Sequence, residues 1–143
     1  MPNKKQRYSL KITLVGPDDE LLESVLAALM DQTVAVDGIR IGSAGMETKD
    51  SDVRALIMSP RDTAMDLLFS LSYRGATGAL IVLPEVTPEL ETEYRNEVRE
   101  NLGDRYPTRV FEAGDCLDED KCAELAQLFT DLLEEMLEQR QKR

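Results

Sequence analysis

The fold of this chain is decided by residues Leu10–Leu29, LKITLVGPDDELLESVLAAL. The segment Leu10–Val15 is a mostly apolar run with the length and composition of a β-strand. A glycine and a proline interrupt the run, and leucines and alanines then recur at helical spacing over Glu20–Met30. Asp18 or Asp19 is the expected N-cap of this helix, because a carboxylate accepts hydrogen bonds from free backbone N–H groups. A strand that enters a helix through a glycine turn predicts an α/β domain.

The same turn lacks the residues of a phosphate-binding loop. The P-loop motif is G-x-x-x-x-G-K-[ST], in which backbone N–H groups and a lysine bind phosphate and a hydroxyl group binds Mg²⁺. Counted from Gly16, the second glycine, the lysine and the hydroxyl positions hold Leu21, Leu22 and Glu23. Carboxylates in this turn would each repel a phosphate by roughly 1 kcal/mol or more. The sequence therefore predicts that ordinary phosphate binding is lost.

The composition is that of a small acidic domain. With 143 residues, 42% of them hydrophobic, the chain is long enough for a single domain with its own core. We expect a flexible basic tail at residues 1–7 and one domain at residues 8–143. A net charge of −11 argues against nucleic-acid binding. The apolar runs are too short for direct membrane insertion and no signal region is evident, which predicts a cytoplasmic protein.

The two cysteines, Cys116 and Cys122, are predicted to be free, half-buried thiols. Without any histidine they are too few for a zinc site. Cys116 also lacks a histidine that would activate it as a nucleophile. We therefore expect no metal site and no catalytic residue.

The rest of the chain alternates strand and helix patterns. Apolar and polar side chains alternate with period two over residues 33–41 and again over residues 53–58. A stretch rich in turn residues separates the two runs, so we expect them to form an antiparallel hairpin. Residues 64–73 fit either a short helix or an irregular segment. Further strands are expected at 78–83 and 108–111, and further helices at 88–101 and 119–140. This order predicts a three-layer α/β/α sandwich, with a mostly parallel sheet and one antiparallel edge strand.

One stretch resembles a known family. Residues 62–89, DTAMDLLFSLSYRGATGALIVLPEVTPE, are similar to the D-T-A-G-Q-E and S-Y-Y-R-G-A-x-G segments of Ras-superfamily small GTPases, of the Rab type. LKITLVG before this stretch, TVAVD at Thr33–Asp37 and TRVFEAG at Thr108–Gly114 resemble further segments of the family in the right order. The resemblance covers about two thirds of the chain. It implies a small-GTPase-like, P-loop NTPase-like topology.

The departures from the family pattern all fall at the nucleotide site. The glycine of D-x-x-G corresponds to Met65, and no N-K-x-D motif is present. Only one helix is expected between the strands at 78–83 and 108–111, which implies a truncated fold without the strand and helix that carry base recognition. Thr33 and Asp62 alone match magnesium-related positions. The resemblance thus marks a set of vestigial nucleotide-site positions: Gly16, Leu21, Leu22, Glu23, Thr33, Asp62 and Met65.

These observations favour a pseudo-GTPase, a non-catalytic protein-interaction module without a cofactor. The resemblance places a candidate partner surface at the former switch, formed by Met65, Leu67, Phe69 and Tyr73. Alternatively, these side chains close the vacated nucleotide pocket together with Leu21 and Leu22. Two other functions stay open: an atypical GTPase that holds GTP or GDP through backbone N–H groups, with Mg²⁺ at Asp62 and Thr33, and a self-assembling structural subunit.

Overall fold

A six-stranded mixed sheet forms the middle of the molecule, with strand order β2-β3-β4-β1-β5-β6. The structure, a computed structural model, describes residues 6–36, 38–47, 51–61 and 66–142, with the backbone course alone for residues 36 and 66–69. In these residues the strands are β1 (Gln6–Val15), β2 (Gln32–Val36), β3 (Ile39–Glu47), β4 (Ser51–Pro60), β5 (Gly78–Leu83) and β6 (Thr108–Glu112). The helices are α1 (Asp19–Leu29), α2 (Asp66–Tyr73), α3 (Pro88–Leu102) and α4 (Glu119–Gln141).

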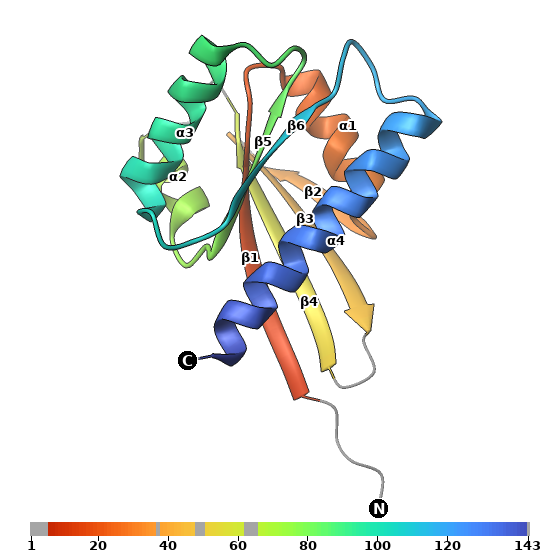
Figure 1. Cartoon of the computed structure of the whole chain (residues 1–143), viewed down its shortest axis with the longest axis vertical. Helices are drawn as coiled ribbons and strands as arrows, with labels where there is room; N and C mark the ends of the chain where they lie inside the picture. The colour runs from red at the N-terminus through yellow and green to blue at the C-terminus, as the bar shows by residue number, and fades with distance from the viewer. Residues whose placement is uncertain (1–5, 37, 48–50, 62–65, 143) are drawn as a thin grey trace, which may run out of the picture.

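Helices cover both faces of this sheet. α1 and α4 lie on one face, and α2 and α3 lie on the other (Figure 1). β1 pairs in parallel with β4 and β5, and β5 pairs in parallel with β6. The predicted α/β architecture with a mostly parallel sheet is therefore confirmed.

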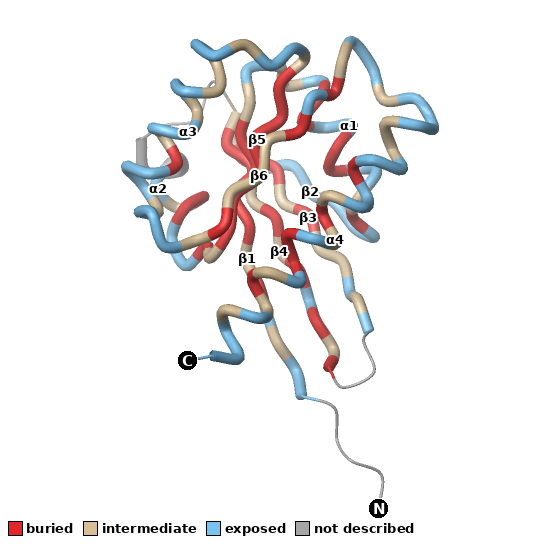
Figure 2. The backbone as a smooth tube through the Cα atoms, in the orientation of Figure 1, coloured by how far each residue is buried: buried red, intermediate tan, exposed pale blue. Residues whose placement is uncertain are grey.

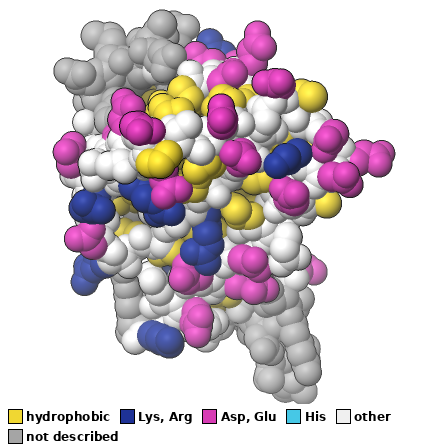
Figure 3. All heavy atoms as spheres, turned by 45° about the horizontal axis from the view of Figure 1, so that its top comes forward, with side chains coloured by type: hydrophobic (Ala, Val, Ile, Leu, Met, Phe, Trp, Pro, Cys, Tyr) yellow, Lys and Arg dark blue, Asp and Glu magenta, His cyan; other side chains and the backbone are white. Residues whose placement is uncertain are grey.

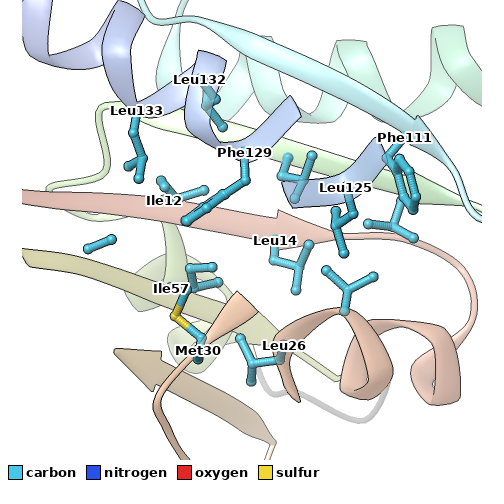
Figure 4. Packing of buried hydrophobic residues seen from close by; sticks show 14 of the residues in the cluster. Ile12, Leu14, Leu26, Met30, Ile57, Phe111, Leu125, Phe129, Leu132 and Leu133 are labelled. Carbon is cyan, nitrogen blue, oxygen red and sulfur yellow. The ribbon is translucent and has the colours of Figure 1, made fainter. Parts of the chain in front are cut away.

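The larger part of the core lies between the sheet and the helices α1 and α4. Ile12 and Leu14 of β1 lie in this cluster with Leu125 and Phe129 of α4 (Figure 4). Ile12, Leu14 and Leu125 have no solvent exposure, and burial of each such side chain contributes about 1.5–3 kcal/mol. On the other face a smaller cluster joins Val15 to residues of α2, α3 and β5. The buried residues thus follow the middle of the strands (Figure 2).

The prediction of a single strand over residues 33–41 is wrong. The stretch contains β2 and the beginning of β3, and Gly38 between them has a φ angle of 83°. A glycine adopts this left-handed conformation without strain, so the chain can reverse there. β3 then continues to Glu47, through residues predicted as turn.

The predicted antiparallel edge strand is also wrong. β3 pairs antiparallel with both β2 and β4, so it is the reversed strand, but it lies second in the sheet. The edge is β2, which was not expected as a separate strand. Consecutive strands joined by short turns pair side by side, and the additional turn places β2 outside β3.

Most other boundaries agree with the sequence patterns. Residues 66–73 form a helix, and Gly103 ends α3 with a φ angle of 83°. β1 begins at Gln6, so Gln6 and Arg7 belong to a strand and not to the predicted tail, and the rest of that tail lies outside the described residues. Among the described helices, none is both long and apolar enough to cross a membrane.

Candidate functional site

The turn between β1 and α1 contains only Gly16, Pro17 and Asp18. Asp18 is the N-cap of α1, as predicted: its Oδ1 accepts hydrogen bonds from the N–H groups of Glu20 at 3.0 Å and Leu21 at 3.2 Å. The free N–H groups of a helix N-terminus are the groups that would bind an anion. The carboxylate of Asp18 therefore occupies the position that a phosphate would take.

The short turn also moves the P-loop positions into the helix. Leu21 and Leu22, at the positions of the second glycine and the lysine, are 4% and 1% exposed and belong to the main core. They are fixed there by the amphipathic pattern of α1, whose other buried residues are Val25 and Leu26. Neither leucine faces a loop in which a ligand would lie.

Gly16 is required by close packing against β5. A Cβ atom at this position would lie 2.2 Å from the carbonyl oxygen of Val82 and 3.2 Å from Cδ2 of Leu22. Contact distances this short exclude a side chain unless the backbone moves. The glycine that the sequence shares with a P-loop thus has a packing role in this protein.

Arg40 of β3 is buried beside this turn, with 2% exposure. Its Nη2 lies 3.1 Å from Oδ1 of Asp19 and donates hydrogen bonds to Oγ of Ser59 at 3.3 Å and to the carbonyl oxygen of Pro60 at 3.4 Å. Its Nε and Nη1 are buried and donate no hydrogen bond. A buried guanidinium depends on its carboxylate partners, because an uncompensated charge in the interior is costly.

Glu23 connects Arg40 to a second arginine. Oε1 of Glu23 lies 2.7 Å from Nη2 of Arg61 and 3.9 Å from Nη1 of Arg40. The carboxylates of Asp19 and Glu23 are 43% and 49% exposed, so the pair with Arg61 is a surface interaction of about 0.2–1 kcal/mol. Asp19, Glu23, Arg40 and Arg61 are called the α1 ion network below. In it, α1 is held to β3 and to the end of β4 by charge pairs within the chain.

Sequence reasoning missed both arginines. The available signal for Arg40 was its position in the alternation of β3. Arg40 points to the same face of the strand as Gly42 and Ala44, and this face is covered by α1. A charged residue in the inward phase of a strand requires a buried partner. Arg61 carried no comparable local signal.

The remaining nucleotide-site positions are not brought together in the described structure. Thr33 is exposed on the edge strand β2, opposite Gly42 in register. Asp62 and Met65 lie outside the described residues, so the predicted magnesium pair stays a prediction. Within the described residues no group of three or more possible metal ligands occurs.

The proposed switch surface is corrected at Tyr73. Tyr73 is 4% exposed, and its hydroxyl group donates a hydrogen bond of 3.1 Å to Oε2 of Glu97 on α3. Burial, and then the nearby carboxylate of Glu97, raise the pKa of Tyr73. Tyr73 thus fixes α2 to α3 and offers no exposed ring to a partner. Met65 and the side chains of Leu67 and Phe69 lie outside the described parts of the chain.

The carboxyl ends of the parallel strands form a strongly acidic surface. In Figure 3, which brings this end forward, acidic side chains predominate around apolar ones. Beyond the turn at α1, the loops after β5 and β6 and the starts of α3 and α4 contribute Glu85, Glu89, Glu112, Asp115, Asp118, Glu119 and Asp120. Val86, in the loop after β5, is one of the exposed large apolar residues, with 37% exposure.

Both cysteines are free thiols, as predicted. Cys122 is half-buried at the start of α4, whereas Cys116 is exposed and not half-buried. Cys116 lies in the loop after β6, where the chain has left the covered part of the sheet.

Comparisons with known proteins identify no family. No protein-family model matches the chain, and no curated protein matches its sequence. The small-GTPase-like topology therefore remains a proposal that rests on the motifs of the sequence.

Proposed function

We propose that this chain is a non-catalytic, small-GTPase-like interaction module that binds a protein partner without nucleotide. The observation that carries this proposal is the N-terminus of α1, where the carboxylate of Asp18 already accepts the hydrogen bonds of two backbone N–H groups. A phosphate group would have to displace Asp18. It would then lie beside the carboxylates of Asp19 and Glu23.

The α1 ion network supports the same proposal. In a nucleotide-binding protein, ligand charges hold the first helix and the switch segments together, and they do so only while nucleotide is bound. Here Arg40 and Arg61 pair with carboxylates of the same chain. The domain is then held in one arrangement by folding alone, which suits a constitutive binding module.

The acidic end of the sheet indicates the chemistry of the partner. A surface of carboxylates attracts a basic protein surface and repels nucleic acid and anionic lipid. Val86 adds an exposed apolar contact within this surface, and Met65, Leu67 and Phe69 stay candidates on the sequence alone. We therefore propose a basic protein partner in the cytoplasm, with no cofactor.

Isothermal titration with Mg²⁺-GTP and Mg²⁺-GDP, together with a melting scan, tests the absence of nucleotide binding. We expect neither heat nor a change in Tm. Binding with a Kd below about 10 μM would overturn the proposal. The melting scan would also reveal such binding, because a ligand at 100 times its Kd stabilises the folded state by about 2.7 kcal/mol and raises Tm by several degrees. Light scattering over a dilution series tests the self-assembling alternative, which a monomer at all concentrations would exclude.

A further inference from the structure

The two edges of the sheet differ in how well they are protected. β2 lies at one edge, and in the described part of the chain no strand pairs with its outer side (Figure 1). Its residues 32–35 are all exposed. The opposite edge strand, β6, carries the charged residues Arg109 and Glu112, and its first four residues are buried or half-buried. An edge strand presents free backbone N–H and C=O groups that can pair with a further strand, so β2 is the accessible edge.

The sequence of β2 is typical of an interior strand. Its five residues, QTVAV, include no charged residue and no proline, and Thr33, Val34 and Val36 are β-branched. β-branched residues favour strand pairing, whereas a charged side chain or a proline on an edge strand prevents it. In a chain with 31% charged residues, an exposed strand without charge is unexpected unless another strand covers it.

A row of apolar side chains ends at this edge. Val34 is 60% exposed, more than the other exposed large apolar residue. The register pairs Val34 with Ile41 of β3 and Ile41 with Met58 of β4, and both of these are half-buried. Paired residues point to the same face of a sheet, which here is the face opposite α1. A strand added beside β2 would extend this row and cover Val34.

On the α1 side, the charges beside this edge are compensated. Ala35 of β2 is paired with Arg40, which belongs to the α1 ion network. In this network Arg40 and Arg61 neutralise the carboxylates of Asp19 and Glu23. The edge therefore lacks the excess of carboxylates that would attract a basic partner to the carboxyl ends of the strands. An uncharged strand is the matching occupant, and β2 itself is such a strand.

We propose that β2 pairs with β2 of a second copy of this chain. Antiparallel pairing about a two-fold axis at Val34 uses all five residues of β2 and joins the two six-stranded sheets. The Val34 side chains of the two copies then lie side by side on one face. Both β2 edges are used in this contact, so the assembly closes at a dimer.

The two-fold arrangement also separates the acidic surfaces. β2 is antiparallel to β3, β3 is antiparallel to β4, and β4 is parallel to β1, so β2 and β1 run in the same direction. Antiparallel pairing of two β2 strands therefore places the carboxyl ends of the parallel strands at opposite ends of the dimer. Each copy has a net charge of −11, and this arrangement keeps the two acidic surfaces apart.

Light scattering of the full chain at increasing concentration measures the association. One pair of strands is at the low end of interface sizes, so we expect a Kd of about 100 μM, with mostly monomer at about 10 μM and mostly dimer at about 1 mM. Because both copies are acidic, about 0.5 M NaCl should strengthen the dimer at least about threefold, whereas it would weaken binding of a basic partner. A monomer at about 1 mM in this salt would overturn the proposal.

Substitutions at two exposed valines test the location of the contact. Val34→Lys places two lysines side by side at the centre of the dimer and should weaken it at least about tenfold. Val86→Lys is the matched control, because it makes the same change at the other exposed large apolar residue and should not weaken the dimer. Both variants lower the net negative charge equally, so general repulsion cannot account for a difference. A dimer that survives Val34→Lys would overturn the proposal, and melting curves verify that both variants fold.

A cross-link tests the register. Opposite residues of an antiparallel pair have Cα atoms about 4.5–5.5 Å apart, which is within the range of about 4.4–6.8 Å for a disulfide. In a Cys116→Ser background, Val34→Cys should therefore give a covalent dimer with oxidised glutathione, and Val86→Cys should not. A non-covalent dimer that Val34→Cys fails to cross-link would overturn pairing about Val34. None of these experiments involves nucleotide or a basic partner, so their failure is distinguishable from failure of the proposed function.

Discussion

Removal of Asp19 should destabilise the protein more than removal of the arginine that it neutralises. Arg40 is 2% exposed, while the carboxylate of Asp19 is 43% exposed. In Asp19→Ala the guanidinium stays buried, and its nearest remaining carboxylate is Glu23 at 3.9 Å. In Arg40→Met the buried charge is gone, and the two carboxylates can turn to water.

The magnitudes follow from this asymmetry. Removal of one partner of a fully buried pair costs about 3–5 kcal/mol, and partial exposure of Asp19 reduces this to about 1.5–2.5 kcal/mol. Arg40→Met should lie within about 1 kcal/mol of the wild type, because an apolar side chain of similar volume often replaces a buried ion pair without loss. In the Arg40→Met background, Asp19→Ala should cost only the loss of a helix-dipole interaction, about 0.3–1 kcal/mol.

Urea denaturation measures these differences. With a slope of about 2 kcal/mol/M, a loss of 2 kcal/mol moves the midpoint by about 1 M. Glu20→Ala is the matched control, because Glu20 is an exposed acidic residue in the same first turn of α1. The reasoning is refuted if Arg40→Met destabilises as much as Asp19→Ala, or if the two changes are additive in the double variant.

Three further predictions concern single positions. Gly16→Ala should destabilise the protein by about 1–3 kcal/mol in the same urea assay, because the added Cβ atom would lie 2.2 Å from the carbonyl oxygen of Val82. Gly45→Ala is its control: the Cβ atom added there has no atom within 4 Å, so this variant should be as stable as the wild type or more stable. Burial raises the pKa of Glu97 above its ordinary 4.5, so near that pH the folded state binds more protons than the unfolded state. The wild type should therefore lose stability relative to Glu97→Gln as pH rises above about 4.5. Melting curves of both proteins across pH test this, and a difference in Tm that does not change with pH would contradict it. Leu22→Lys, which restores the P-loop lysine, should unfold the domain or lower its Tm sharply without creating GTP affinity, because Leu22 is 1% exposed; nucleotide binding by a folded Leu22→Lys variant would contradict it.

The elements that the sequence predicts well are those defined by local signals. Asp18 caps the start of α1, as predicted, and Asp118 and Gly103, residue types typical of helix ends, cap the start of α4 and the end of α3. Each cap depends on hydrogen bonds within one helical turn. Such interactions can be identified without knowledge of the rest of the fold.

The errors have physical reasons of two kinds. The sequence does contain a signal for the division of residues 33–41 into β2 and β3. The apolar residue Val34 is at an even position, whereas the apolar residues Ile39 and Ile41 are at odd positions, so one uninterrupted strand could not place them on the same face. The Asp37–Gly38 pair at this point is a typical turn dipeptide. The α1 ion network, in contrast, joins residues far apart in sequence: Arg61 and Glu23 are separated by 38 positions. Such pairs depend on the strand order, which local patterns do not determine.

The length of the turn after β1 accounts for several departures from the P-loop pattern together. A P-loop needs its first helix to begin late, so that four residues after the first glycine remain free to surround phosphate. Here α1 begins at Asp19, and Leu21 and Leu22 become core residues of the first helical turns. Once these positions are buried, a lysine at residue 22 is excluded by desolvation, and the helix N-terminus needs a carboxylate of its own, which Asp18 supplies. The carboxylate of Asp18 therefore follows from the early start of the helix, and the carboxylate of Asp19 in the same turn neutralises the buried Arg40.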